Sequence, residues 1–426
     1  MASELEHWSL VVAGGGPAGF MAAIAAAEAG VRRVLVLEST PEPLGKVLIS
    51  GGGRCNVTHA CWDPRDLVRA YPRGGQALRG PFSRFAAGDA VAWFADHGLE
   101  LVEEADGRLF PRSNRSSSVI ACLRGAAERA GVVLRRQSAL VAASPNPGGG
   151  FALELRGGQP LRTEHLVLAT GSHPSGRRLA EGLGHGVVPP VPSLFTLALR
   201  PNPLAALAGV VMDPVDLELE LVAPGGAVER FRQRGPLLIT HWGFSGPATL
   251  RLTAFAARAL QASGYRAELR VDWSGGRAEP ELEAWFAACR RDQARRQLSN
   301  ARPWPELSRR LWQHLLEQEG VAPERRWADL PKRQQQGLIE ALRRSRYAVA
   351  GRGPFGEEFV TAGGVALGEV NLATMESRRV PGLHLVGELL DVDGITGGFN
   401  FQHCWSSGWL AGQAIATAAA ATAERA

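Results

Sequence analysis

The feature that most constrains the fold is a glycine triplet near the N-terminus, at Gly14, Gly16 and Gly19. It follows a short apolar strand expected at 9–12 and opens an Ala-rich helix expected to end at Glu28. In such a strand–turn–helix unit the glycines permit a tight turn, a close approach of backbone amides to a pyrophosphate, and close packing of the helix. The sequence therefore predicts a dinucleotide-binding βαβ unit.

The residues around the triplet favour the same function. The next strand, expected at 34–37, ends on Glu38, where a carboxylate can accept hydrogen bonds from ribose hydroxyls. Pro17 and Ala18 lead into the helix, whose positive N-terminal end faces the phosphates. A glycine-rich turn followed by a surface glutamate is the alternative interpretation. The cofactor-binding residues predicted here are Gly14, Gly16, Pro17, Ala18, Gly19 and Glu38.

A second triplet with the same spacing occurs at Gly351, Gly353 and Gly356. The residues that follow it, 357–364, are typical of a strand and a turn, so no helix N-terminus is available to a pyrophosphate. We interpret this triplet as structural. The chain thus offers one dinucleotide fingerprint, and a second, firmly bound nucleotide is not predicted.

Further segments are expected to surround the ring system of the cofactor. Segment 45–58 holds three consecutive glycines followed by Arg-Cys-Asn, and strand 166–169 ends in a small-residue turn, although a plain loop is the alternative for the first. The segment 394–401 leads into a helix, whose N-terminus can stabilise the negative charge that a flavin develops on reduction. The cofactor-binding residues predicted in these and neighbouring segments are Gly45, Lys46, Ser50, Gly53, Arg54, Cys55, Asn56, Leu140, Ala169, Thr170, Gly171, Gly387, Glu388, Gly397, Gly398, Phe399, Asn400 and Phe401.

Taken together, these blocks resemble the bacterial NAD(P)/FAD-dependent oxidoreductases of the BaiN-like group, relatives of aminoacetone oxidase. The resemblance covers almost the whole chain and implies an α/β fold, in which a glutathione-reductase-like, Rossmann-type FAD-binding domain is interrupted by a β-rich domain and a helical subdomain. It also implies noncovalently bound FAD. Residues 403–405 depart from the better-known members, which implies a distinct branch with its own substrate. The most specific segments are 49–58, 240–248, 360–365, 374–377 and 387–400.

Changes in composition and in the expected secondary structure along the chain indicate the same domain organisation. Prolines at 189, 190 and 192 mark a boundary, because consecutive prolines cannot extend a helix or a central strand. Beyond them, short strands are expected at 194–199, 217–222, 237–240, 267–271 and 347–350. We predict an FAD-binding domain at 1–192 and 351–426, a β-rich substrate domain at 193–278 and 346–350, and a helical subdomain at 279–345.

His241 is the first candidate for a catalytic proton donor or acceptor. It is expected to end a strand just before Ser245, the expected N-cap of a helix, in an inserted domain expected to cover the flavin. A structural histidine at a domain contact is the alternative. His403 is the second predicted catalytic residue, His173 is a weaker candidate, and Cys55 is expected to contact the flavin through its backbone rather than its thiol.

The predicted reaction is a two-electron transfer between a small organic substrate and FAD, with NAD(P)H as a transient reductant. The alternatives are an amine or amino-ketone oxidase that uses oxygen, and an RNA-modifying flavoprotein that binds RNA through its Arg-rich helical insert. Acidic residues interspersed among those arginines argue against the latter. A serine hydrolase is excluded, because Pro247 stands where its Gly-x-Ser-x-Gly motif requires the last glycine.

Composition sets the remaining limits. The 47 basic and 42 acidic residues form no basic block with interleaved aromatics, so nucleic acid is not an expected partner. Five scattered cysteines are not a disulfide framework, which favours a cytoplasmic location. No secretion signal, membrane-spanning segment or metal-ligand set is expected from the sequence.

Overall fold

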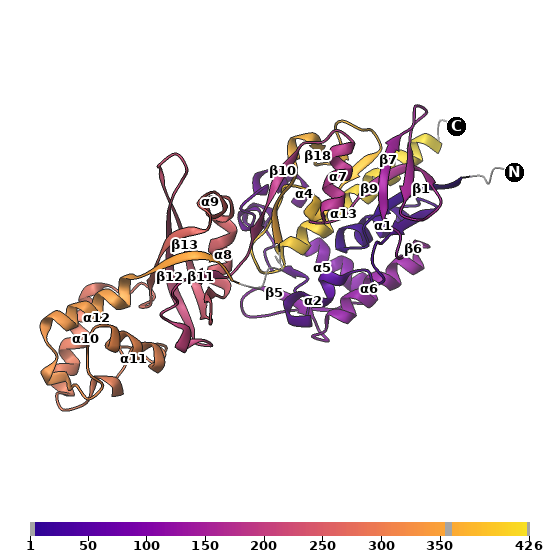
Figure 1. Ribbon diagram of the computed structural model, residues 1–426. Coiled ribbons are helices and arrows are strands. Elements are labelled where there is room, and N and C mark those ends of the chain that lie inside the picture. The colour runs from indigo at the N-terminus through magenta and orange to yellow at the C-terminus, as the bar shows by residue number, and fades with distance from the viewer. Residues whose placement is uncertain (1–4, 354–359, 424–426) are drawn as a thin grey trace. The chain divides into compact units, whose positions relative to one another are not determined.

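The computed structural model describes residues 5–353 and 360–423 (Figure 1). The chain divides into two compact units, the first formed by Met1–Pro190 and Val360–Ala426 and the second by Val191–Phe359. The second unit is therefore an insertion in the chain of the first. Its further division into a β-rich domain and a helical subdomain stays a prediction, and one hydrophobic core includes side chains from both parts.

A nine-stranded sheet forms the centre of the first unit, with its main path in the order β18-β19-β20-β9-β1-β2-β6 and β7 and β8 joined beside β9. Strand β1 pairs in parallel with β2 and β9, and Leu10, Val11 and Val12 are fully buried there. Parallel strands covered on both faces are apolar throughout, which explains these runs. The strands are β1 (Glu6–Ala13), β2 (Val34–Leu37), β6 (Val133–Arg135), β7 (Leu140–Pro145), β8 (Phe151–Leu155), β9 (Leu161–Leu168), β18 (Val370–Asn371), β19 (Glu376–Ser377) and β20 (Leu383–Leu385).

Two helices rich in small residues pack closely together in this unit. A Cβ atom at Gly408 would lie 2.5 Å from the Ala18 carbonyl oxygen, and one at Gly412 would lie 2.7 Å from that of Ala22. Small side chains therefore allow α1 and α13 to approach closely, as the Ala-rich sequences of both helices indicate. The helices are α1 (Pro17–Glu28), α2 (Gly45–Gly53), α3 (Pro64–Leu67), α4 (Arg79–Phe82), α5 (Ala87–Asp96), α6 (Ser116–Arg129), α7 (Pro174–Gly182) and α13 (Phe399–Ala423).

Two smaller sheets complete the first unit. One has the order β3-β5-β4, from β3 (Thr58–His59), β5 (Arg108–Pro111) and β4 (Leu101–Glu103). The other pairs β10 (Val187–Ser193) with β17 (Val360–Val365). The prolines lie within β10, and the division between the two units falls in the proline run, between Pro190 and Val191. A two-stranded sheet has only outer edges, where a residue without an N–H group is tolerated.

The second unit contains a closed barrel in the order β11-β14-β13-β12-β15-β16. Its strands alternate buried and exposed residues, and β12 and β13 are each twelve residues long, which is longer than the sequence predicts. Gly351 lies in β16, and Gly356 of the second glycine triplet lies outside the described residues. The strands are β11 (Leu197–Leu199), β12 (Val211–Val222), β13 (Val228–Ile239), β14 (Gly243–Ser245), β15 (Arg266–Asp272) and β16 (Ser345–Arg352).

Helices accompany the barrel in the second unit, and buried Trp312 and Trp327 belong to the hydrophobic core that the helices share with the strands. The helical character predicted for 279–345 is therefore confirmed over most of that stretch. The helices are α8 (Pro247–Phe255), α9 (Ala257–Ala262), α10 (Glu279–Asp292), α11 (Arg309–Gln318) and α12 (Lys332–Arg344).

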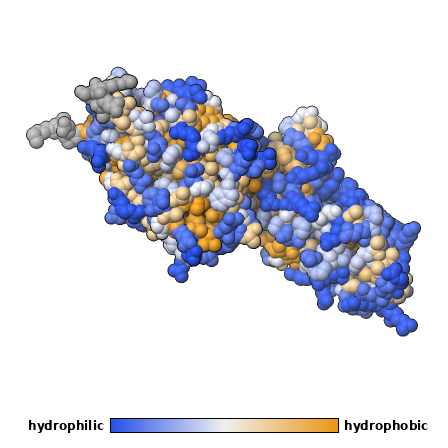
Figure 2. Space-filling model, turned by 180° about the vertical axis from the view of Figure 1, so that it is seen from behind, coloured by the Kyte–Doolittle hydropathy of each residue, from blue (hydrophilic) through white to orange (hydrophobic). Residues whose placement is uncertain are grey.

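The two units differ in charge. Residues 191–359 include 24 basic and 19 acidic residues, whereas the rest of the chain has 23 of each, so the whole net charge of +5 belongs to the second unit. Hydrophilic residues cover much of this unit on the face shown in Figure 2, where it lies at the right. Among the residues that the structure describes, no helix combines the length and apolar character needed to cross a membrane.

Candidate functional site

The structure brings the three glycines of the N-terminal triplet together, with Gly14 and Gly16 in the turn between β1 and α1 and Gly19 in the first turn of α1. Gly14 has a φ of +118°, and a Cβ atom there would lie 2.4 Å from the Ala169 carbonyl oxygen. A Cβ atom at Gly19 would lie 2.0 Å from the carbonyl oxygen of Gly14. In contrast, a Cβ atom at Gly16 would meet nothing within 4 Å. Two glycines are thus required for packing, while the third faces open space at the start of α1.

Glu38 lies beside this turn, at the end of β2. Its Oε2 atom accepts a hydrogen bond from the backbone N–H of Gly15 over 2.9 Å. Its Oε1 atom accepts from the backbone N–H and the hydroxyl of Thr40, each over 2.7 Å. These bonds fix the carboxylate next to the glycine turn, which is the position that ribose recognition requires.

An ion pair joins two other predicted cofactor-binding residues. The ammonium of Lys46, at the start of α2, lies 2.6 Å from Oε2 of Glu388 and donates to the hydroxyl of Ser172 over 3.0 Å. Glu388 lies in the short helix η7 (Gly387–Leu389), and its Oε1 atom accepts from the Thr361 N–H over 3.1 Å. Four segments that are separate in the sequence thus meet at one place.

The glycine run in α2 interrupts the helix. Ser50 is extended, and Gly51, Gly52 and Gly53 have φ values of +56°, +68° and +85°. Cβ atoms at Gly52 and Gly53 would meet nothing within 4 Å. Like Gly16, Gly52 and Gly53 therefore face open space with little more than backbone, as a site for a large planar ligand requires.

The side chain of Arg54, directly after this run, is already engaged, whereas the buried Oδ1 atom of Asn56 has no hydrogen-bond partner. The Arg54 guanidinium pairs with Glu104, bonds to Asn114, and lies with its Cζ atom 3.9 Å from the ring centre of Phe110. Burial raises the pKa of the Cys55 thiol to about 11, so this thiol is protonated at neutral pH. The expectation that Cys55 contributes its backbone rather than thiolate chemistry agrees with this pKa.

Asn400 clamps the loop before α13. Its Oδ1 atom accepts from the Gly394 N–H over 2.8 Å, and its Nδ2 atom donates to the Gly394 carbonyl over 2.9 Å. At Gly398 a Cβ atom would lie 2.7 Å from the Thr58 carbonyl oxygen, and the Phe399 ring stacks on His59 with 4.8 Å between ring centres. The predicted residues 397–400 thus form a tightly held turn at the N-terminus of α13.

A buried ion pair that sequence reasoning missed supports this loop. Arg73 and Asp393 are joined by two hydrogen bonds between guanidinium and carboxylate, and Asp393 is completely buried. Nearby, the Ile395 N–H donates to the Ala70 carbonyl over 2.8 Å. The two partners lie 320 residues apart, and no local pattern in the sequence could have connected them.

The remaining predicted residues occupy less informative positions. Thr170 has a buried hydroxyl without a hydrogen-bond partner, packed where a Cβ atom at Gly176 would lie only 1.6 Å away. Leu140 is buried at the start of β7, and Phe401 stacks on Trp405 with 5.8 Å between ring centres. Direct contact of these residues with a cofactor stays a prediction.

His403 is fully enclosed in α13. Its Nε2 atom lies 3.2 Å from the Gly387 carbonyl oxygen, its Nδ1 atom has no hydrogen-bond partner, and burial lowers its pKa to about 4. The imidazole is therefore neutral at pH 7. Its catalytic role stays a prediction.

We expect His403 to make the stability of the protein dependent on pH. Its pKa is about 4 in the folded protein against 6.5 ordinarily, so the unfolded chain binds more protons between these values. The free energy of unfolding should therefore fall as the pH drops from 6.5 to 4, by about 3 kcal/mol from this residue. Urea denaturation of His403→Gln across this range should show a flatter dependence. His7→Gln, at an exposed histidine, should leave the slope unchanged, and equal slopes in all three proteins would contradict the assignment.

In the second unit, His241 lies in the turn between β13 and β14 and is exposed. The expected local structure needs two corrections. β13 ends at Ile239 rather than at the histidine, and Ser245 belongs to β14, so that Gly246 is the N-cap of α8. The Ser245 hydroxyl instead accepts a hydrogen bond from the Thr196 hydroxyl over 3.1 Å. His173, in the first unit, caps α7 by accepting from the Ser175 N–H over 3.2 Å.

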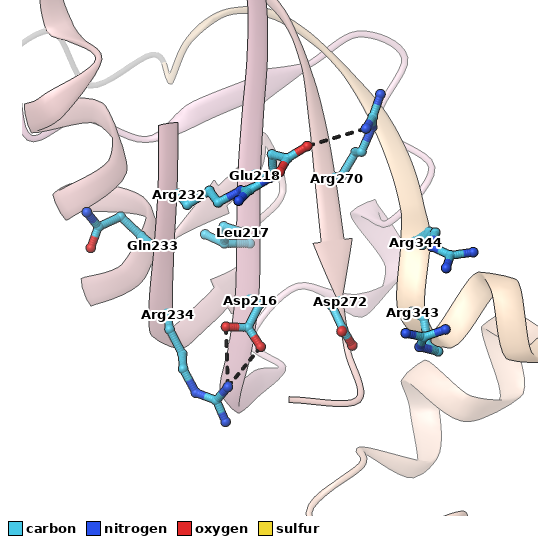
Figure 3. A pocket seen from close by; sticks show the side chains of 10 residues that line it. All are labelled: Asp216, Leu217, Glu218, Arg232, Gln233, Arg234, Arg270, Asp272, Arg343 and Arg344. Atoms are coloured by element: carbon cyan, nitrogen blue, oxygen red, sulfur yellow. Dashed lines mark hydrogen bonds and ion pairs between the residues drawn. The ribbon is translucent and has the colours of Figure 1, made fainter. Parts of the chain in front are cut away.

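A charged cavity of about 510 Å³ lies on the outside of the barrel (Figure 3). Ion pairs join its side chains across neighbouring strands, with Arg234 3.1 Å from Asp216 and Arg270 3.3 Å from Glu218. Acidic groups therefore compensate much of its positive charge. The cavity is lined by Asp216, Leu217, Glu218, Arg232, Gln233, Arg234, Arg270, Asp272, Arg343 and Arg344.

The first unit fits a dinucleotide cofactor. Open space lies beside Gly16 and beside Gly52 and Gly53. Helix α1 begins directly after the glycine turn, and Glu38 is hydrogen-bonded to that turn through the Gly15 N–H. This is the arrangement in which a helix N-terminus binds a pyrophosphate and a carboxylate binds a ribose. The described residues contain no cluster of three or more histidine, cysteine, aspartate or glutamate side chains suited to a metal ion.

Comparison with known proteins agrees with this fold. The model of the HI0933-like protein Rossmann domain matches residues 8–414. The chain is 31% identical over 439 residues to the ribosomal RNA dihydrouridine synthase of Escherichia coli, covering 97% of this chain and 99% of that protein. It is also 31% identical over 429 residues to the 3-dehydro-bile acid delta(4,6)-reductase of Clostridium scindens, covering 95% and 98%.

Among solved structures, the 3-ketosteroid-delta4-(5alpha)-dehydrogenase of Rhodococcus jostii RHA1, in complex with 4-androstene-3,17-dione, shares the fold with a TM-score of 0.51. Its sequence is 16% identical, and the match covers 98% of each chain. The Rossmann-type architecture predicted from the sequence is confirmed, as is the resemblance to the BaiN-like group. The chain belongs to the HI0933-like family.

Proposed function

We propose that this protein is an FAD-dependent oxidoreductase that reduces a carbon–carbon double bond conjugated with a carbonyl group in a small organic substrate. One observation carries the proposal. Two relatives, each 31% identical over nearly the whole chain, have names that denote reactions at such bonds. We also propose that NAD(P)H reduces the enzyme transiently, since the sequence offers one dinucleotide fingerprint and no second firm nucleotide site.

The two names describe one chemistry. Dihydrouridine is uridine saturated at the ring bond conjugated with a carbonyl, and the double bonds of a 3-dehydro-delta(4,6) steroid are conjugated with its 3-keto group. Saturating such a bond requires a hydride at the carbon remote from the carbonyl and a proton at the carbon next to it. A common enzyme scaffold can therefore serve both substrates if it supplies a hydride and a proton donor.

In this proposal the residues of the first unit bind and orient FAD without a covalent bond. The turn at Gly14–Gly19 and the N-terminus of α1 hold the pyrophosphate, and Glu38 accepts hydrogen bonds from the ribose. The Gly51–Gly53 run and the loop clamped by Asn400 surround the ring with backbone groups. When bound, FAD supplies the chemistry of hydride transfer.

The proposed proton donor is His241. Its side chain is exposed, while its carbonyl oxygen accepts from Nδ2 of Asn202 over 2.9 Å, so the backbone is fixed and the imidazole is free to meet a substrate. We expect His241→Ala to slow the reaction of reduced enzyme with substrate by about 100-fold, as the loss of a general acid does. Stopped-flow measurement of flavin reoxidation checks this. His7→Ala is the control, and an unchanged rate in His241→Ala would remove the residue from the mechanism.

The proposed function is tested with the purified protein under anaerobic conditions. We expect a yellow protein that releases FAD on denaturation, is bleached by NAD(P)H, and regains its colour when a conjugated enone such as 4-androstene-3,17-dione is added. A colourless protein that FAD cannot reconstitute would refute the whole proposal. Failure to bleach, together with peroxide formation from an amine or amino ketone in air, would favour the oxidase instead.

A second candidate is the same reduction carried out on ribosomal RNA. A relative at 31% identity and another from Haemophilus influenzae at 26% identity carry the name of a ribosomal RNA dihydrouridine synthase. The entire net charge of +5 lies in the second unit, and this positive charge favours the binding of a polyanion such as RNA. The ion pairs of the charged cavity oppose this candidate. Salt-dependent binding to ribosomal RNA and dihydrouridine formation in it would favour RNA over a small substrate.

A further inference from the structure

Lys46 is attached to the glycine turn of the first unit. The backbone N–H of Leu44, two residues before it, donates to the Gly15 carbonyl over 2.9 Å. The Lys46 ammonium donates to the hydroxyl of Ser172 over 3.0 Å, and Ser172 lies in the loop after β9, which packs against Gly14. Backbone and side chain therefore both place this cation close to the turn.

Glu388 comes to the same place from η7. A Cβ atom at the preceding Gly387 would lie only 2.8 Å from that of Ala18, in the first turn of α1. The Gly387 N–H donates to the Ser407 hydroxyl over 3.0 Å, which fixes this part of the backbone. The side chain of Glu388 is only 15% exposed, and its Oε1 atom accepts from the Thr361 N–H over 3.1 Å. A poorly solvated carboxylate is thus held near the start of α1.

This carboxylate raises an electrostatic problem for the cofactor. In the proposed function the start of α1 receives a pyrophosphate, which is a dianion. A carboxylate nearby repels it, and the low solvent exposure of Glu388 leaves this repulsion weakly screened by water and salt. The ammonium of Lys46, 2.6 Å from Oε2 of Glu388, offsets the negative charge. Without that ammonium, the phosphates would meet a negatively charged site.

We propose that Lys46 is a positioning residue, which neutralises and orients Glu388 so that a cofactor with a pyrophosphate can bind at the glycine turn. This inference rests on the proposed function, because it takes FAD as that cofactor. Lys46 acts on the cofactor through Glu388, rather than by pairing with a phosphate itself. Both partners are fixed before the cofactor binds, Lys46 by Ser172 and Glu388 by the Thr361 N–H. The pair is therefore preorganised, and little side-chain entropy is lost on binding.

The test is a titration of the apoprotein with FAD, followed by flavin fluorescence. Lys46→Met removes the ammonium from the Glu388 carboxylate and should raise the dissociation constant of FAD roughly 10- to 100-fold, the range expected for one charged interaction. Lys46→Arg keeps the charge and should stay within about fivefold of the wild type. In the double variant Lys46→Met with Glu388→Gln both charges are absent, so FAD affinity should return to within about fivefold of the wild type.

Lys332→Met is the matched control, because it removes the same charge from the only other lysine of the chain, which is exposed at the start of α12 in the second unit. It should leave FAD affinity unchanged. Circular dichroism shows whether each variant is folded. If Lys46→Met does not fold, the double variant still decides, because it leaves neither charge without its partner.

Two results would overturn the inference and leave the proposed function standing. One is a Lys46→Met protein that binds FAD as the wild type does. The other is a folded double variant that binds FAD roughly 10- to 100-fold more weakly than the wild type, since Lys46 would then contact the phosphates itself. A wild-type apoprotein that binds no FAD would instead refute the proposed function together with this inference. FAD affinity that depends on Lys46 as expected, without reduction of an enone, would refute only the proposed reduction.

Discussion

Replacing Gly16 with valine is expected to abolish FAD binding and leave the fold intact. Gly16 has a φ of −89°, which valine can adopt, and a Cβ atom there would meet nothing within 4 Å. In the proposed complex, this open space receives the pyrophosphate at the start of α1. A branched side chain would keep the phosphates away from the helix N-terminus. We expect FAD to bind at least about 100-fold more weakly, or about 3 kcal/mol.

Fluorescence titration of the apoprotein with FAD measures this loss, and circular dichroism shows whether the fold persists. Gly88→Val is the matched control, because a Cβ atom at that helical glycine also meets nothing within 4 Å and no cofactor contact is proposed for it. Gly19→Val should differ from both, since its Cβ atom would lie 2.0 Å from the Gly14 carbonyl oxygen and must disturb the turn itself. Normal FAD affinity in a folded Gly16→Val protein would show that the cofactor is not bound at this turn.

The βαβ unit could be predicted because its determinants are local. The strand, the glycine turn, α1 and β2 occupy consecutive residues from Glu6 to Leu37, and each part limits what the next can be. The barrel was only partly predictable. Short apolar runs indicated strands, but closure depends on pairings such as Leu197 with Phe244, which no local pattern specifies.

Part of the candidate site could likewise be predicted from local sequence, and part depends on long-range contacts that could not. The glycines of the turn and Glu38 follow from a spacing rule, and the structure brings them together. The Lys46–Glu388 ion pair joins residues that were predicted separately but could not be paired from sequence. The engagement of Arg54 by Glu104 was missed for the same reason, since long-range contacts between charged side chains leave no periodic signal in a single sequence.

Replacing Asp393 with alanine is expected to destabilise the first unit by about 3–5 kcal/mol. Asp393 is completely buried, and the side chain of its partner Arg73 is only 14% exposed. Removing the carboxylate takes charge-assisted hydrogen bonds away from a guanidinium in a poorly solvated place, which costs far more than the loss of a surface pair. Denaturation in urea measures the change in the free energy of unfolding.

Asp66→Ala is the matched control, because Asp66 pairs with Arg69 at the surface, where their side chains are 58% and 80% exposed. That pair should contribute no more than about 1 kcal/mol. Equal effects of the two substitutions would refute a structural role for the buried pair.

The double variant Arg73→Met with Asp393→Leu separates two roles of the ion pair, which are to stabilise the fold and to position the loop before α13. Apolar replacement of a buried ion pair is often neutral, so most of the lost stability should return. The two hydrogen bonds between Arg73 and Asp393 would not return, and they hold the segment just before the loop that Asn400 clamps. If that loop surrounds the flavin, the double variant should be stable yet bind FAD more weakly than the wild type. Wild-type FAD affinity in this stable variant would limit the ion pair to a role in folding.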